Sequence, residues 1–317
     1  MRYRNLGRSG LKVSTVSLGS WRTFGLTIDQ ATTEACMKSG YEEGINYFDG
    51  AEGYGSGRAE DAMGVVLRKM KWPRESLVIS SKVFQKADAP NQRGLSRKHV
   101  VEACDAALNR MGLDYLDLYF CHRPDPETPL EETVATMHEL ILRGKILYWG
   151  TSMFSGAQIM HAHALARQYG YTPPTMDQCV YNMFHREQLE REIDLPIKEL
   201  GYGTTVFSPL AVGFLSGKYN EGVPDDSYAA TMEDESRGNF LADEKIAKSR
   251  KLAVIASDLN IPQARLALAW CLKNPGVSTV LTGASRAEQV KQNAKAAEDV
   301  DLLTEEVMAR IEEILQT

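Results

Sequence analysis

Short apolar runs alternate with amphipathic segments along almost the whole chain. The apolar runs predict strands at 16–18, 46–49, 77–82, 115–121, 146–150, 175–178, 204–207 and 278–282. Helical spacing of apolar residues predicts helices near 29–43, 58–70, 96–111, 130–143, 155–169, 187–200, 262–273 and 286–297. Strands that alternate with helices are typical of parallel βαβ units, and eight such repeats with no obvious linker favour a closed barrel. We therefore predict an α/β fold in which residues 1–317 form a single domain, a (β/α)8 TIM barrel.

Three segments lie outside this repeat. Residues 3–13, "YRNLGRSGLKV", have the pattern of a β-hairpin with Arg8, Ser9 and Gly10 in the turn, which we expect to close the bottom of the barrel. Residues 216–242 are rich in Gly, Pro, Ser and acids, and a connection of this length is a functional lid or a disordered loop. Residues 304–315 begin with a capping-box-like Thr304 and predict an extra amphipathic C-terminal helix.

Composition excludes several classes of function. The chain is 43% hydrophobic and 25% charged, with a net charge of −6 and a pI near 5.6, so it has no footprint for nucleic acid or an anionic membrane. The five cysteines are scattered and lack metal-ligand spacing, which indicates reduced thiols in a cytoplasmic protein without a metal. The N-terminus is too polar for a signal peptide, and no apolar run approaches the roughly 18 residues of a membrane span.

Four polar residues fall at or just beyond the ends of different predicted strands. Asp49 ends "INYFD", Tyr54 lies in the following loop, Lys82 ends "LVISSK", and His122 ends "YLDLYFCH". In a parallel barrel these side chains converge at one mouth, where catalytic residues of such barrels lie. A phenol becomes a better general acid when a nearby ammonium favours the phenolate, so Lys82, held by Asp49, would assist Tyr54. The set predicts proton donation to a carbonyl oxygen, with His122 orienting that carbonyl.

Each of these residues also has an ordinary structural interpretation. Lys82 could be a solvated strand end, Tyr54 a surface residue, Asp49 a cap or turn residue, and His122 a satisfied core histidine. Their joint placement after successive strands favours the catalytic interpretation.

A second candidate site follows the last predicted strand. Gly283, Ser285 and Arg286 lie where a helix begins, and backbone N–H groups with a guanidinium suit a phosphate group. The alternative is an ordinary N-cap at Ser285 with a solvated Arg286. The glycine cluster at 53–57 lacks the GxGxxG spacing and a following acidic partner, so we reject a Rossmann interpretation.

Several long motifs carry a family resemblance. They include "YRNLGRSGLKVS", "FDGAEGYGSGRAE", "HRPDPETPLEETV", "YWGTS", "YNMF", "SPLAVGFLSGKY" and "LALAWCLKNPGVSTVLTGAS". Through them the chain resembles, nearly end to end, the aldo-keto reductases. Within these it resembles the branch containing the β-subunits of voltage-gated potassium channels and related microbial and plant aldehyde reductases. By resemblance, Tyr54 is the general acid, Lys82 and Asp49 tune it, and His122 completes the tetrad.

The resemblance also implies NADP(H) stretched across the barrel mouth. The implied contacts are Ser20, Trp21, Thr27 and Asp49 at the nicotinamide; Ser152 and Gln178 on its carboxamide; Phe207 stacked on its ring; Ser208, Pro209, Leu210, Gly213 and Lys218 along the pyrophosphate; and Gly283, Ser285, Arg286, Gln289 and Asn293 around the 2′-phosphate. Three departures stand out. His122 replaces an Asn of the animal β-subunits, Phe207 replaces a Trp, and Asp226 and Tyr228 replace a Tyr and an Arg that contact the cofactor.

These observations favour an NADPH-dependent reductase of small aldehydes and ketones, whose partner is a small carbonyl substrate. The alternatives are a channel-docking protein that uses bound NADP(H) as a redox sensor, and a structural barrel without cofactor. Relatives often form homotetramers, to which the extra C-terminal helix could contribute. Arg123 either attracts an anionic substrate or pairs with Asp125 or Glu132.

Overall fold

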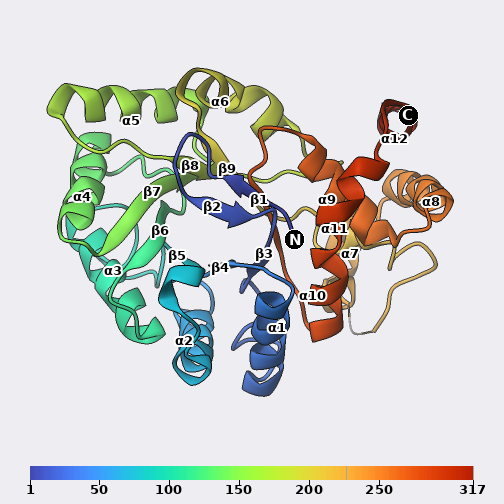
Figure 1. Cartoon of the computed structure of the whole chain (residues 1–317), viewed down its shortest axis with the longest axis horizontal. Coiled ribbons are helices and arrows are strands. Elements are labelled where there is room, and N and C mark those ends of the chain that lie inside the picture. The colour runs from blue at the N-terminus through green and yellow to red at the C-terminus, as the bar shows by residue number, and fades with distance from the viewer. Residues whose placement is uncertain (226, 317) are drawn as a thin grey trace.

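Eight parallel strands form the centre of the molecule in the computed structural model, which describes residues 1–225 and 227–316 (Figure 1). The strands are β3 (Val16–Gly19), β4 (Tyr47–Asp49), β5 (Val78–Val83), β6 (Leu116–Cys121), β7 (Ile146–Ser152), β8 (Met176–Gln178), β9 (Gly203–Val206) and β10 (Thr279–Thr282). Neighbours in the barrel follow chain order, and β10 pairs in parallel with β3 to close it. The predicted (β/α)8 barrel and all eight strands are confirmed.

Helices surround the barrel. They are α1 (Gln30–Glu42), α2 (Arg58–Met70), α3 (Arg97–Met111), α4 (Leu130–Leu142), α5 (Gly156–Tyr169), α6 (Asp194–Leu200), α9 (Gln263–Lys273) and α10 (Ala287–Ala294). Local signals set several of their ends. Ser96, for example, accepts a hydrogen bond from the His99 amide and so satisfies a donor at the start of α3.

The observed helices differ from the predicted ones in three places. The segment predicted as one helix at 187–200 contains a π-helical turn (Gln188–Glu192) followed by α6. The helix predicted at 286–297 ends at Ala294, and a short α11 (Ala296–Asp299) follows. A long helix, α8 (Asp243–Asp258), was not predicted, and its weak apolar stripe buries only Ser249, Leu252, Ile255 and Ala256.

Segment 216–242 contains local structure in its described residues. A 3-10 turn (Phe214–Ser216) precedes it, and η4 (Tyr228–Thr231) and α7 (Asp234–Phe240) lie within it. The ring of Phe240 meets those of Phe214, Tyr219 and Tyr228 edge-on, at centroid distances of 5.6 to 5.9 Å. This aromatic cluster holds η4 and α7 against the segment that follows β9.

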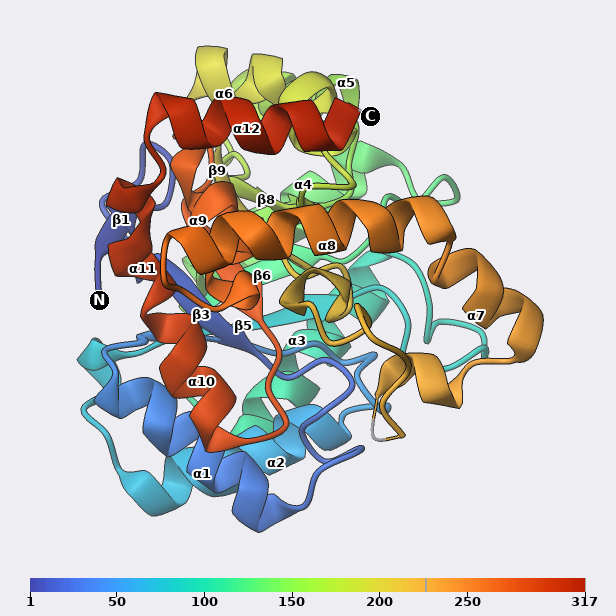
Figure 2. The same ribbon diagram turned by 90° about the vertical axis from the view of Figure 1, so that its right-hand side faces the viewer.

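The two terminal segments form as predicted. The antiparallel strands β1 (Tyr3–Asn5) and β2 (Lys12–Ser14) form the predicted hairpin. Its fully buried Leu6 and Val13 belong to the same cluster as Tyr47 and Val78, the first residues of β4 and β5. The hairpin therefore closes the N-terminal end of the barrel. The C-terminal helix α12 (Glu305–Gln316) lies along α8 (Figure 2). Thr304 caps α12 by accepting a hydrogen bond from the Val307 amide at 3.3 Å.

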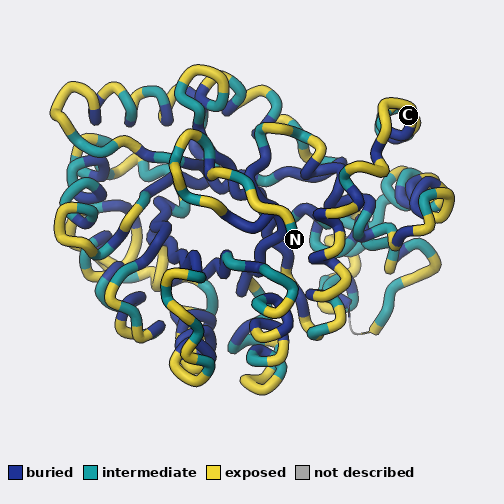
Figure 3. The backbone as a smooth tube through the Cα atoms, in the orientation of Figure 1, coloured by how far each residue is buried: buried dark blue, intermediate teal, exposed yellow. Residues whose placement is uncertain are grey.

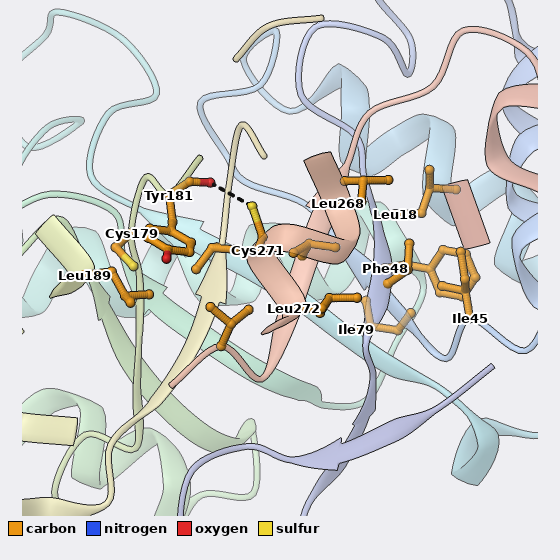
Figure 4. Close-up of a cluster of buried hydrophobic side chains, with 14 of the residues drawn as sticks. Leu18, Ile45, Phe48, Ile79, Cys179, Tyr181, Leu189, Leu268, Cys271 and Leu272 are labelled. Atoms are coloured by element: carbon orange, nitrogen blue, oxygen red, sulfur yellow. Dashed lines mark hydrogen bonds between the residues drawn. The ribbon is translucent and has the colours of Figure 1, made fainter. Parts of the chain in front are cut away.

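The core has two layers because strand side chains alternate between the barrel interior and the helices. On β5, Val78 faces the interior cluster, whereas Ile79 and Val83 pack in the outer layer beneath the helices. The strands are therefore buried along most of their length (Figure 3), and Figure 4 shows part of the outer layer, including Phe48 and Leu272. All five cysteines are buried free thiols, as predicted.

None of the helices in the described ranges combines the length and apolar character that crossing a membrane requires.

Candidate active site

Strand alternation places Asp49 and Lys82 inside the mouth of the barrel. On β4, Tyr47 belongs to the interior cluster, so Asp49 two residues later faces the interior as well. On β5 the same spacing carries the interior face from Val78 to Lys82. Both ionised residues are buried, with 3% of Asp49 and 0% of Lys82 exposed, so each needs a partner close by.

The four predicted catalytic residues come together around the Lys82 ammonium. Lys82 Nζ donates hydrogen bonds to Asp49 Oδ2 at 2.5 Å, to the Gly50 carbonyl at 2.7 Å and to Tyr54 Oη at 3.1 Å. The His122 ring meets the Tyr54 ring edge-on, with centroids 5.7 Å apart. One ammonium thus links the acid to the phenol, and the imidazole lies beside that phenol.

Side chains from β4, β5 and β8 hold the Asp49 carboxylate in place. Its Oδ1 accepts hydrogen bonds from Ser80 Oγ at 2.7 Å, from Gln178 Nε2 at 3.0 Å and from the Tyr47 hydroxyl at 3.1 Å. Gln178 ends β8, so this contact spans the mouth of the barrel. Asp49 therefore presents Oδ2 to Lys82 from a fixed position.

Burial is the largest influence on the pKa of Tyr54. It raises the pKa of Tyr54, and the Lys82 charge, which favours the phenolate, offsets only part of that effect. For Lys82, burial opposes the charge, but Asp49 and Tyr54 outweigh it and the pKa is raised. The Lys82 charge acts in the expected direction, but burial outweighs it, and a protonated phenol lies next to a charged ammonium.

The His122 imidazole is neutral. Burial, together with the Lys82 and Arg123 charges, holds the pKa of His122 well below its ordinary value of 6.5. A neutral imidazole carries one N–H donor and one acceptor, so His122 can donate a hydrogen bond to an oxygen without adding a charge to the site.

Residues predicted at the nicotinamide end follow β3, β7, β8 and β9. The Ser20 hydroxyl donates to the Asp49 carbonyl at 2.8 Å, and the Ser152 hydroxyl donates to the Gln178 carbonyl at 2.8 Å. Phe207 directly follows β9 and packs on the interior cluster. Trp21 is 46% exposed, and Thr27 is exposed in the same loop with its hydroxyl donating to the Arg22 carbonyl.

The predicted pyrophosphate residues lie in a loop with an unusual backbone. Ser208 has a φ of 52°, and the consecutive Ala211, Val212 and Gly213 have φ values of 47°, 57° and 88°. A β-branched residue rarely adopts this left-handed conformation, and turns of this kind direct successive N–H groups to one side. A methyl group on Gly213 would lie 2.7 Å from Lys218 Nζ, so the missing side chain lets that ammonium approach the loop. Pro209 and Leu210 lie between these residues.

The predicted 2′-phosphate residues lie at the start of α10, except Asn293, which is next to the last residue of this helix. Gly283, Ser285 and Arg286 are exposed there, whereas Asn293 is buried on the helix. Gln289 Oε1 accepts hydrogen bonds from the Ser285 amide at 2.8 Å and the Ser285 hydroxyl at 3.2 Å. Ser285 and Gln289 therefore contact one another, and Arg286 extends from the N-cap position.

Tyr228, within segment 216–242, reaches the loop after β3. The Arg22 guanidinium lies 3.9 Å from the Tyr228 ring centroid and 5.2 Å from that of Trp21. Asp226, the other residue of this segment singled out in the sequence, lies outside the described residues.

Three further residues support the site but were not predicted. Glu52, 1% exposed, accepts a hydrogen bond from the Phe84 amide at 2.8 Å and pairs with His99 Nε2 at 3.2 Å. Its own amide donates to the Lys82 carbonyl, so Glu52 ties the Tyr54 loop to the end of β5. Asn182 donates to the Ser208 carbonyl at 2.9 Å. The motifs "FDGAEGY" and "YNMF" contained the signal, but their buried contacts depend on the fold.

Comparison with known proteins agrees with this geometry. The Aldo/keto reductase family model matches residues 15–316. The chain belongs to the aldo/keto reductase family. Membership makes it an oxidoreductase of a family that uses nicotinamide cofactors on carbonyl substrates.

Curated relatives match along the whole chain. A probable voltage-gated potassium channel subunit beta from Arabidopsis thaliana is 45% identical over 100% of this chain and 97% of that protein. A protein of the same description from Oryza sativa subsp. japonica is 44% identical over 100% of this chain and 97% of its own length. A putative voltage-gated potassium channel subunit beta from Schizosaccharomyces pombe is also 44% identical, over 99% of this chain and 93% of its own length. The predicted resemblance to this branch is confirmed.

Proposed function

We propose that this protein is an NADPH-dependent reductase that converts aldehydes and ketones to alcohols, with Tyr54 as the general acid. The observation that carries the proposal is the Lys82 ammonium, hydrogen-bonded to both Asp49 and Tyr54 at the barrel mouth. This arrangement provides a proton donor and a positive charge that stabilises the donor after the proton has left.

The chain's residues account for the proton side of the reaction. The raised pKa of Tyr54 keeps its phenol protonated at neutral pH, and the phenol gives that proton to the carbonyl oxygen. Lys82 then stabilises the phenolate that remains on Tyr54. The neutral His122 donates its N–H to the carbonyl oxygen of the substrate and so orients the carbonyl. Reduced nicotinamide, when bound, supplies the hydride that adds to the carbonyl carbon, so carbon gains the electron pair and oxygen gains the proton.

The residues present fit NADPH. The loop at 208–213 has a left-handed backbone at Ala211, Val212 and Gly213 beside Lys218, and a backbone of this kind together with an ammonium suits a pyrophosphate. The exposed Ser285 and Arg286 at the start of α10 suit one further phosphate, the group that distinguishes NADPH from NADH. Ser152, Gln178 and Phe207 would hold the nicotinamide over the tetrad.

The Tyr54→Phe variant tests the assigned acid. It removes one hydroxyl and keeps the ring that meets His122. We expect NADPH oxidation in the presence of small aldehydes to fall by about 10²-fold or more, because general acid catalysis contributes that much. The variant should still bind NADPH, and quenching of tryptophan fluorescence measures this binding. Aldehyde-dependent turnover unchanged in Tyr54→Phe would refute the role.

A second candidate function rests on the names of the relatives. The relatives from Arabidopsis, rice and fission yeast are named as potassium channel β-subunits, which favours a channel-associated protein that senses the redox state of bound NADP(H). Affinity purification of the full chain from its own cells, with parallel turnover assays, separates the two functions. Recovery of a channel protein together with negligible multiple turnover would favour the second.

A further inference from the structure

Arg123 lies at the rim of the candidate active site. It directly follows His122 at the end of β6, and its side chain is exposed. Its Nη1 donates to the His122 carbonyl at 2.7 Å and to Ser152 Oγ at 3.3 Å. Because Ser152 is the buried last residue of β7, these contacts hold the guanidinium between the ends of β6 and β7, beside the imidazole of the tetrad.

Arg123 forms no ion pair with a carboxylate among residues 1–225 and 227–316, although its charge acts on the buried Asp177 and opposes the rise that burial causes in the pKa of that group. Asp125, the nearest acid in sequence, accepts hydrogen bonds from the Leu95 amide and the Thr128 hydroxyl, both at 2.7 Å. Asp49, the acid inside the mouth, is bound by Lys82. Glu132 accepts instead from the Arg97 amide. Of the two alternatives for Arg123, the ion pair with Asp125 or Glu132 is therefore wrong.

The effect of this charge reaches the reacting groups. Arg123 contributes to the lowered pKa of His122, after burial and Lys82, and is among the charges that favour the Tyr54 phenolate. Arg22, in the loop after β3, differs because its guanidinium lies over the Tyr228 and Trp21 rings. Arg123 has no such aromatic cover among the described residues, and its Nε and Nη2 remain available to an incoming group.

We propose that Arg123 binds an oxyanion on the substrate, so that the site prefers aldehydes that carry a carboxylate or a phosphate. This inference rests on the proposed reductase function and names its substrate class. A guanidinium whose Nη1 is anchored can still use Nε and Nη2 as a planar fork, which matches two oxygens of a carboxylate or phosphate. The oxyanion itself does not react; the carbonyl at the other end of the substrate is reduced by Tyr54 and the nicotinamide.

Matched aldehyde pairs test the inference with the full-length protein and NADPH. One pair is succinic semialdehyde and butanal, and the other is glyceraldehyde 3-phosphate and glyceraldehyde. The variants are Arg123→Gln, Arg123→Lys and, as a control that removes the same charge from the exposed end of α4, Arg143→Gln. Thermal unfolding confirms that each variant is folded, and fluorescence quenching measures its affinity for NADPH.

We expect the wild type to favour the anionic member of at least one pair, and that pair identifies the oxyanion. Arg123→Gln should raise KM for that aldehyde about tenfold or more. It should change KM for the neutral partner and the Kd for NADPH by much less, because in the part of the chain that the structure describes Arg123 touches the cofactor site only through Ser152. Arg123→Lys should be intermediate, and Arg143→Gln should resemble the wild type. Equal loss with neutral and anionic aldehydes, a loss of NADPH affinity in Arg123→Gln as large as the loss for the anionic aldehyde, or no anionic preference in the wild type would overturn the inference while leaving the reductase function in place. No turnover of any of the aldehydes would overturn the reductase function itself.

Discussion

Replacing Lys82 by methionine isolates the role of the buried ammonium. Methionine keeps an unbranched side chain of similar length inside the barrel, so the substitution removes a charge without opening a large cavity. The Asp49 carboxylate then stays buried without its cation, and breaking a buried pair by removing one partner costs about 3–5 kcal/mol. Asp49 keeps three neutral donors, from Ser80, Tyr47 and Gln178, so we expect the lower end, a loss of about 3 kcal/mol in the free energy of unfolding.

A double-mutant cycle provides the assay. Urea unfolding of the wild type, Lys82→Met, Asp49→Asn and the double variant gives the interaction energy between the two residues. The double variant should lose less stability than the sum of the single losses, because it contains no unpaired buried charge. Lys98→Met, which removes an exposed ammonium from α3, should change stability by no more than about 0.5 kcal/mol. Strictly additive losses, or a Lys82→Met variant as stable as the Lys98→Met control, would refute the reasoning.

Two further predictions concern the cofactor and pH. Arg286→Ala should weaken NADPH binding about tenfold and leave NADH binding unchanged, because only NADPH carries the phosphate assigned to Arg286. Titration of fluorescence quenching with both cofactors measures the two affinities. Equal weakening of NADPH and NADH binding would contradict the assignment. The pKa of His99 is raised above its ordinary value of 6.5, since its hydrogen bond and charge interaction with Glu52 outweigh burial. Its contribution to stability is therefore fully present below the unfolded-state pKa and is lost as pH rises through the folded-state pKa. Urea unfolding should show a larger stability difference between wild type and His99→Gln near pH 6 than near pH 9, and a difference that grows with pH would contradict the assignment.

The barrel was predictable because its strands are short, continuous apolar runs separated by helices. Buried parallel strands have this pattern regardless of their neighbours, so β3 through β10 could be placed from local sequence. Helix α8 was missed because its apolar stripe is weak. It packs against α9, the next helix in the sequence, and against α12 at the C-terminus, and its own residues do not reveal these contacts. The π-helical turn at 188–192 was missed for a related reason: tertiary contacts such as Arg186 to Glu312 of α12 surround this region.

The tetrad could be predicted for a geometric reason. In a parallel barrel all strand ends of one kind meet at the same mouth, and side chains alternate along each strand, so sequence position determines both the height and the direction of Asp49 and Lys82. No such rule applies to Glu52, Arg123 or Tyr228, whose partners are His99, Ser152 and Arg22. Each of these contacts joins a loop residue to a distant part of the chain, and a loop's path is set by the packing of the whole mouth.

The pKa of Tyr54 shows the same division between local and global information. The sequence placed an ammonium that favours the phenolate beside the phenol, yet burial in the enclosed mouth raises the pKa of Tyr54. The opposing effects suit a general acid, since burial keeps the proton on the phenol until a carbonyl oxygen accepts it, and Lys82 then stabilises the phenolate that remains. In a solvated lysine–tyrosine pair the ammonium would still stabilise the phenolate, but no burial would keep the proton on the phenol. The barrel therefore contributes to the chemistry through the burial of these groups as well as through their positions.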